Sequence, residues 1–448
     1  MTAKKIELLA PAGSLKTMRY AFAYGADAVY AGAARYSLRM RGNEFNDELL
    51  KQGIDEAHAL GKQFFLTVNT MPHNYKLQTA IRDLTPALAA KPDACIMSDP
   101  GLIMVVKEAF PDMPIHLSVQ ANTVNWATVK FWQRNGISRV ILSRELSLKE
   151  IEEIRQQCPD MELEVFVHGA LCIAYSGRCL LSGYFNNRDP NQGTCTNACR
   201  WSYHTHDSHE DEQGEFIPTP DHIFSPDALQ GLTDPSERHP LADRTYFLEE
   251  KTRPGEYMEI SEDDHGTYIM NSRDLRAIEH VGELVRIGVD CLKIEGRTKS
   301  HYYAARTAQI YREAIDDAYA GRSFNPDLNR RLEGLANRGY TDGFFVRRQI
   351  KAQQNYNTGS SNAATQQFVG EVIDYNPDTG LATIEAKNHF ARGDSVEIIT
   401  PHGNRTLTLG TLYDRKQCTE VDAAKGSGWQ VQADIGAVDT FTLLAKNL

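Results

Sequence analysis

The sequence predicts an α/β protein: a (β/α)8 TIM-like barrel with an inserted cysteine-rich loop region, followed by a small C-terminal antiparallel β-barrel domain. Short apolar runs alternate with amphipathic segments of helix length, which is the pattern of repeated βα units around a parallel sheet. There are eight such runs, enough to close a barrel. After Phe368 the pattern changes to short alternating segments separated by turns, typical of a small antiparallel barrel.

Each apolar run is short enough for one buried strand. The predicted strands are Ile6–Pro11, Ala28–Gly32, Gln63–Asn69, Ala94–Met97, Pro114–Ser118, Arg139–Ser143, Leu163–Gly169 and Asp290–Gly296. An open doubly wound sheet is the alternative, but the PAGS sequence after the first run lacks the spaced glycines of a dinucleotide-binding loop. Ser14 is expected to cap the first helix, and Met270–Gly288 and Arg297–Gly321 are predicted helices.

The same pattern sets the predicted domain limits. Residues 1–325 form the barrel, with an insertion at 170–270 that contains the cysteines. Between Arg200 and about Tyr268 the chain is polar and acidic, and a solvated loop is expected there. Residues 326–366 are a connector of low hydrophobicity, and residues 367–448 form the small β-barrel domain.

Composition is that of an ordinary soluble protein of 448 residues, with 41% hydrophobic and 24% charged residues. No apolar run is long enough to cross a membrane and no signal peptide is evident, so a cytoplasmic location is expected. The formal net charge is -11, which argues against a surface that is basic throughout. Any contact with nucleic acid must then use a local cationic groove.

Four of the eight cysteines fall within one short stretch and are expected to bind metal. They are Cys172, Cys179, Cys195 and Cys199. Disulfides and scattered buried thiols explain such clustering poorly. Structural zinc is a stronger alternative, but only the last pair has the usual spacing, and an iron–sulfur cluster accepts irregular spacing. Core packing accounts for Cys95, Cys291 and Cys418.

Polar residues lie at or just beyond the ends of several predicted strands. In a (β/α)8 barrel the carboxyl ends of the strands form the active face. The candidates are Asn69, Gln120, Arg144, His168, Glu295 and Arg297, with Arg39 and Arg41 in the loop after the second strand. Each alone is equally explained as a helix cap or turn residue, His168 as a core histidine, and Glu295 with Arg297 as a surface ion pair.

The cysteine stretch also resembles a known family signature. Glu164, Phe166, Gly169, Cys172, Ser176, Gly177, Cys179 and Ser182, followed by a second cysteine pair, resemble the motif of the U32, or collagenase-like, peptidase family. The resemblance extends along the chain through LLAPAGS, GADAVYAG, SLRMRGNEF, LKIEGRTKS and NRGYTDGFF. Members with an assigned chemistry resemble oxygen-independent hydroxylases that carry an iron–sulfur cluster and act on tRNA, ribosomal RNA or a quinone precursor.

The layout here, with an appended β-domain, is similar to the members that act on tRNA. By that resemblance the chain hydroxylates wobble uridine to 5-hydroxyuridine, with a 4Fe-4S cluster and with prephenate as hydroxyl donor. The implied partners are tRNA and prephenate, with no DNA and no membrane. His168, Glu295, Arg297 and Gln120 are then the catalytic candidates.

Substrate contacts follow from the chemistry of these two partners. Prephenate carries two carboxylates, and the planar guanidinium of arginine is suited to bind a carboxylate through two hydrogen bonds. The candidate arginines at the barrel mouth are Arg39, Arg41, Arg144 and Arg297. Asn69 is a further candidate, and Tyr302 can stack on an unpaired base. Arg347, Arg348 and Lys351 can hold the tRNA backbone.

Two other functions stay open. A collagenase-like peptidase that uses His168 and a cysteine needs only a thiolate beside a base, although four clustered thiols have no role in it. A non-catalytic RNA-binding protein is the second alternative. The sequence contains no nucleophile elbow, His-Glu-x-x-His helix or phosphate loop.

Overall fold

The computed structural model describes residues 5–37, 43–70, 72, 74–171, 203–210, 216–223, 246–250, 255, 257–263, 266–269, 273–337, 339–346, 365–426 and 428–448. The chain divides into two compact units. The first contains Met1–His168, Ala277–Ala336 and Ala363–Leu448, and the second contains Gly169–Arg276 and Asn337–Asn362. Among the described helices, none combines the length and apolar content that a bilayer span requires.

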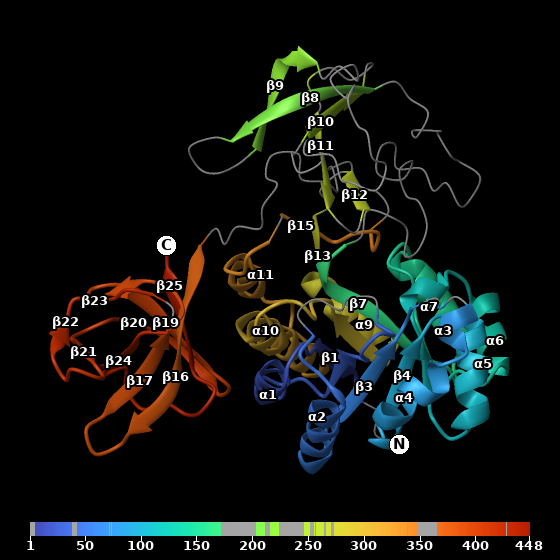
Figure 1. Cartoon of the computed structure of the whole chain (residues 1–448), viewed down its shortest axis with the longest axis horizontal. Coiled ribbons are helices and arrows are strands. Elements are labelled where there is room, and N and C mark those ends of the chain that lie inside the picture. Colours follow the sequence, from blue (N-terminus) through green and yellow to red (C-terminus); the bar gives the residue numbers. More distant parts are fainter. Residues whose placement is uncertain are drawn as a thin grey trace. The chain divides into compact units, whose positions relative to one another are not determined.

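Eight parallel strands close a barrel in the first unit, which confirms the predicted fold (Figure 1). Their order is β14-β1-β2-β3-β4-β5-β6-β7, and pairing of β14 with β7 completes the ring. The strands are β1 Glu7–Pro11, β2 Ala28–Gly32, β3 Gln63–Val68, β4 Ala94–Met97, β5 Ile115–Leu117, β6 Arg139–Ile141, β7 Glu162–Ala170 and β14 Cys291–Ile294. Each lies within about two residues of its predicted position because these runs are buried on both sides.

Helices connect the strands and begin at side-chain caps. Ser14 accepts a hydrogen bond from the Thr17 N–H, as expected from the sequence, and Ser147 forms a capping box with Glu150. The helices are α1 Leu15–Ala23, α2 Asp47–Ala59, α3 Asn74–Leu77, α4 Ala80–Ala89, α5 Pro100–Ala109, α6 Trp126–Arg134, α7 Leu148–Gln157, α9 Val281–Ile287, α10 His301–Tyr319 and α11 Asp327–Glu333.

Two predictions for the inserted region are wrong. Among the described residues of the predicted helix Met270–Gly288, the helical part begins only at Ile278, because β13 (Asp274–Arg276) pairs in parallel with β15 (Tyr340–Thr341). The expected solvated loop contains an antiparallel sheet of order β12-β11-β10-β8-β9. These strands are β8 Tyr203–Glu210, β9 Phe216–Ile223, β10 Tyr246–Glu250, β11 Tyr257–Asp263 and β12 Gly266–Ile269. The polar sequences of these strands do not show the alternating pattern that predicts a strand. Hydrogen bonding between backbone groups defines them, and sequence periodicity does not detect it.

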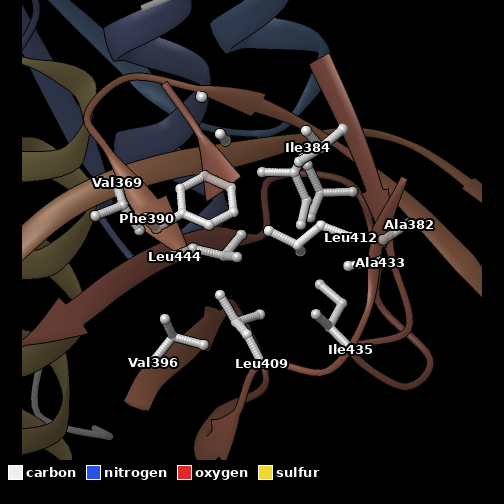
Figure 2. Close-up of a cluster of buried hydrophobic side chains, with 14 of the residues drawn as sticks. Val369, Ala382, Ile384, Phe390, Val396, Leu409, Leu412, Ala433, Ile435 and Leu444 are labelled. Carbon is white, nitrogen blue, oxygen red and sulfur yellow. The ribbon is translucent and has the colours of Figure 1, made fainter. Parts of the chain in front are cut away.

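The C-terminal segment is an antiparallel domain, as predicted, of order β20-β19-β25-β16-β17-β24-β21-β22 with a separate β18–β23 pair. The strands are β16 Gln366–Asn376, β17 Leu381–Ala386, β18 Phe390–Ala391, β19 Ser395–Thr400, β20 Gly403–Thr408, β21 Leu412–Asp414, β22 Glu420–Val421, β23 Ala423–Ala424, β24 Gln430–Ala433 and β25 Leu443–Asn447. Figure 2 shows side chains such as Phe390, Ile384 and Leu444 gathered into its apolar core. Cys418 is exposed, so its predicted place in the core is wrong: it follows β21 in a turn, with φ of 51°.

Within the first unit, the C-terminal domain is joined to helices α1 and α10 through Glu371. Its carboxylate lies 2.5 Å from Lys16 Nζ, 2.8 Å from Lys387 Nζ and 3.2 Å from His301 Nε2. The Tyr20 hydroxyl also donates to it. Burial by itself would raise the pKa of Glu371, but His301, Lys16 and Lys387 outweigh burial and hold that pKa well below its usual range.

We expect Glu371→Gln to lower the free energy of unfolding at pH 7 by about 1–3 kcal/mol, because the amide loses charge-assisted hydrogen bonds. Below the ordinary carboxyl pKa of 4.5 the unfolded chain binds a proton at this position before the folded chain does. Wild-type stability should therefore fall as the pH is lowered through that range, and the stability of the variant should fall less. Denaturant unfolding between pH 7 and pH 3 measures both effects.

Glu420→Gln is the matched control, because Glu420 is exposed in the same domain. Equal unfolding curves for the two variants across the pH range would contradict this role of Glu371.

Candidate active site

The carboxyl ends of β6 and β14 bring Arg144 and Glu295 together. Arg144 Nη2 lies 2.9 Å from Glu295 Oε2, and both side chains are about nine-tenths buried. The Arg144 guanidinium also lies over the Phe166 ring, 3.9 Å from its centroid. A planar guanidinium held by a carboxylate and an aromatic face is fixed in one orientation. The Arg144 guanidinium is therefore held rigidly at the strand ends.

Arg297 is fixed at the same end of the barrel by β2 and the turn after it. Its Nη1 donates a hydrogen bond to Ser37 Oγ, and its guanidinium lies 6.0 Å from the Tyr30 ring centroid. Space for it depends on Gly32, where an added Cβ would lie 2.5 Å from Nη1 of Arg297 and 2.8 Å from Ser37 Oγ. The absence of a side chain at Gly32 thus leaves the space that the Arg297 guanidinium occupies.

His168 is a buried residue of β7 and is only 1% exposed. Its Nδ1 lies 3.3 Å from the hydroxyl of Tyr311, which donates to the carbonyl oxygen of Val167 at 2.7 Å. The Glu295 N–H donates to the His168 carbonyl oxygen at 2.8 Å. Since the tyrosine proton is committed to Val167, the Nδ1 contact favours a proton on His168 Nδ1.

Gln120 and its neighbours provide buried oxygen atoms at the ends of β3 and β5. Gln120 lies on a 3-10 turn, Val119–Ala121, and Asn122 follows with a left-handed φ of 53°. Gln120 Oε1, Asn122 Oδ1, Thr67 Oγ1 and Thr123 Oγ1 have no hydrogen-bond partner among the described residues. A buried polar atom without a partner costs free energy, so such a group commonly marks a place that a ligand or water satisfies.

Two further predicted site residues have other described contacts. Asn69 directly follows β3 and is half-buried, and its carbonyl oxygen accepts from Ser98 Oγ. Tyr302 is 7% exposed and stacks on Phe368 of the C-terminal domain, with centroids 4.6 Å apart. Burial raises the pKa of Tyr302 to about 12. Phe368 covers one face of the ring, and a side chain that is 7% exposed offers little surface on which a base can stack.

Several predicted residues lie outside the described part of the chain. These are the cysteines Cys172, Cys179, Cys195 and Cys199, and the cations Arg39, Arg41, Arg347, Arg348 and Lys351. Among the described residues, no three His, Cys, Asp or Glu side chains are grouped as metal ligands. The metal-binding role of the four cysteines therefore stays a prediction.

Cys95 and Cys291, predicted to be core residues, are buried in the barrel. Burial raises the pKa of Cys95 to about 12. Burial and the nearby negative charge of Glu164 raise the pKa of Cys291 well above its usual value. Both thiols stay protonated at neutral pH, so neither provides the thiolate that a cysteine nucleophile needs.

Sequence reasoning missed Lys293 and Glu164, which form an ion pair of 2.8 Å inside the barrel. Lys293 Nζ also lies 4.4 Å from the Tyr30 ring centroid and 5.3 Å from that of Phe166. The available signal was a charged residue in the middle of each of two apolar runs, LEVFVHG and DCLKIEG. In strands that are buried on both sides, such residues must find partners inside.

Gly32→Ala should displace the Arg297 guanidinium and lower the free energy of unfolding by about 1–3 kcal/mol, because the added Cβ overpacks a closed site. A crystal structure of the variant and its denaturant unfolding curve measure the two effects. Gly282→Ala is the control, since nothing lies within 4 Å of its added Cβ and the position is helical. An unmoved Arg297 with wild-type stability in Gly32→Ala would contradict this description of the site.

Comparison with known proteins agrees with this architecture. The model of Peptidase family U32 matches residues 13–237 and 242–355, and the model of the Peptidase family U32 C-terminal domain matches residues 364–444. The second match covers most of the antiparallel domain.

Relatives with similar sequences span nearly the whole chain. The tRNA hydroxylation protein P of Escherichia coli is 60% identical over 427 residues, covering 95% of this chain and 93% of the relative. The protein of the same name from Haemophilus influenzae is 57% identical over 448 residues, covering 99% and 96%. An uncharacterized protease of Methanocaldococcus jannaschii is 34% identical over 403 residues, covering 88% and 86%. The chain therefore belongs to Peptidase family U32.

Proposed function

We propose that this protein is a tRNA-modifying enzyme that hydroxylates the wobble uridine to 5-hydroxyuridine without dioxygen, with prephenate as the hydroxyl donor. The observation that carries the proposal is the 60% identity to a tRNA hydroxylation protein along 95% of the chain. Identity at this level, extending through both the barrel and the C-terminal domain, supports a shared substrate class more strongly than the fold alone does.

The geometry of the barrel mouth suits both proposed substrates. Arg144 and Arg297 are planar cations held in place at the carboxyl ends of strands, and a dicarboxylate such as prephenate is bound well by such forks. The unpartnered oxygens of Gln120 and Asn122 are acceptors, which match the N3–H donor of an unpaired uracil. Glu295 orients Arg144, and His168 anchors the strand end from which Glu295 projects.

We also propose that Cys172, Cys179, Cys195 and Cys199 hold a 4Fe-4S cluster. Four thiolates are the usual ligand set for such a cluster, and their irregular spacing is compatible with it. When bound, the cluster would supply redox-active iron to the reaction. The residues of the barrel mouth would bind and orient the two substrates and exclude water from them.

A peptidase is the second candidate, favoured by the family name and by the protease relative. The two described cysteines of the barrel strands weigh against it, because the buried thiols of Cys95 and Cys291 remain protonated. Use of a cysteine from the cluster would remove a metal ligand. Peptide cleavage that persists after iron removal would support this candidate.

Expression of this chain should restore 5-hydroxyuridine in an Escherichia coli strain that lacks its own tRNA hydroxylation protein P, grown without oxygen. Arg144→Lys and Arg297→Lys should each reduce the modified nucleoside about tenfold or more, because lysine has neither the planar fork nor the stacking face. Mass spectrometry of nucleosides from purified tRNA measures this.

Arg322→Lys is the matched control for these substitutions, since Arg322 is 59% exposed and distant in sequence from the strand ends. If the wild-type chain is soluble in that strain and the tRNA still lacks 5-hydroxyuridine, the proposed activity is wrong.

Protein purified without oxygen should be brown and contain about four irons and four sulfides per chain, as a 4Fe-4S cluster requires. The Cys172→Ala, Cys179→Ala double variant should be colourless, because two thiolates do not hold the cluster. Iron and sulfide analysis with a visible spectrum measures this, and Cys418→Ala, at an exposed cysteine, is the control. Wild-type protein that is colourless or carries zinc would contradict the cluster.

A further inference from the structure

A pocket of about 500 Å³ opens on the C-terminal domain around Trp429, far along the sequence from every residue of the barrel mouth. Its lining joins the turn after β21 to the segment that leads into β24 and includes Asp414, Lys416, Lys425 and Gln430. The pocket therefore combines an aromatic ring, two lysines and an amide. Its volume is that of sites that take a small organic group such as a single nucleotide.

The Trp429 ring is held rigidly. Its Nε1 donates to Asp414 Oδ2 at 2.8 Å, and its backbone N–H donates to the Gly426 carbonyl oxygen at 3.2 Å. The ring is half-buried and packs against the apolar core of the domain. An aromatic surface that is already fixed loses little conformational freedom when a flat ligand stacks on it.

The carboxylate of Asp414 at this pocket accepts hydrogen bonds from neighbouring N–H groups of the domain. Asp414 accepts the backbone N–H groups of Lys416 and Gln417, each at 2.8 Å, as well as the indole N–H. The N–H of Gln417 is the largest contribution that holds the pKa of Asp414 below its usual range. The carboxylate thereby shapes the turn and orients the ring, and these three N–H donors partly offset its negative charge.

The two lysines of the pocket differ from other lysines of the domain. Lys387 and Lys446 form ion pairs with carboxylates. In the part of the chain that the structure describes, Lys416 and Lys425 have no such pair, and Lys425 Nζ lies 5.7 Å from the centroid of the Trp429 ring. With two lysines and one carboxylate, that of Asp414, among its lining residues, the pocket is locally positive in a protein of net charge -11.

We propose that this pocket binds one unpaired nucleotide of the RNA substrate, with the base stacked on Trp429 and the adjoining phosphates contacted by Lys416 and Lys425. Stacking on a fixed aromatic ring with lysines along the backbone is the general way in which proteins hold single-stranded nucleic acid. The inference rests on the proposed function for the identity of the RNA as tRNA. It adds a second RNA contact on a domain other than the barrel.

The test is binding of an unmodified tRNA transcript to the full chain, measured by fluorescence anisotropy over a range of salt concentrations. Trp429→Ala should weaken binding about tenfold, as expected for the loss of one stacked base, and Trp429→Phe should remain within about threefold of wild type. The Lys416→Ala, Lys425→Ala double variant should reduce the salt dependence by about one to two phosphate contacts.

Trp126 provides a matched control on the barrel. It is 39% exposed, and Lys130 Nζ lies 4.8 Å from its ring centroid, but it does not line this pocket. Trp126→Ala should leave binding unchanged. A Trp429→Ala protein that unfolds as cooperatively as wild type and binds tRNA equally well would overturn the proposal.

The outcomes separate this inference from the proposed activity. If Trp429→Ala weakens binding but the chain forms no 5-hydroxyuridine in cells, the RNA pocket stands and the proposed reaction fails. If hydroxylation is restored but the variants of Trp429 and of both lysines bind tRNA as tightly as wild type, the proposed reaction stands and the pocket proposal fails.

Discussion

Closure of the barrel depends on a buried set of charges in its interior, where barrels of this type usually pack branched aliphatic side chains. Arg139 Nη1 lies 2.7 Å from Glu7 Oε1 and 3.3 Å from Glu164 Oε2, and Lys293 Nζ lies 2.8 Å from the other oxygen of Glu164. Each buried charge costs several kcal/mol unless it is paired. The four residues come from β1, β6, β7 and β14, so correct pairing requires the register that closes the ring.

The same interior charges position the residues of the barrel mouth. The Phe166 ring lies close to both Lys293 and Arg144, with cation-to-centroid distances of 5.3 and 3.9 Å. Tyr30 likewise lies near Lys293 and Arg297, at 4.4 and 6.0 Å. Each aromatic side chain thus lies near an interior lysine and a guanidinium at the mouth. The orientation of the two arginines is set by the packed interior, which is the support that a preorganised site needs.

The barrel strands could be predicted from the sequence because burial on both sides leaves uninterrupted apolar runs, as in β2 and β4. The sheet of β8 to β12 could not, because backbone pairing defines its strands while their polar sequences lack an alternating apolar pattern. At the site, the polar residues at strand ends were identifiable, and Arg144 does meet Glu295. The position of Tyr302 was not, since nothing local indicates that Phe368 covers it.

The junction between the barrel and the C-terminal domain gives that domain a defined place in the first unit. Arg306 of α10, 1% exposed, pairs with Glu397 of β19 at 2.6 Å, and Glu371 of β16 binds cations from both sides. Breaking such buried pairs is costly, so they stabilise the contact between the C-terminal domain and helices α1 and α10. Two weak contacts on one chain strengthen each other through effective concentration. A protein with net charge -11 gains little from long-range attraction to RNA. For the proposed function, local contacts at the barrel mouth and at the Trp429 pocket are therefore the physical means of holding a polyanion that the net charge leaves.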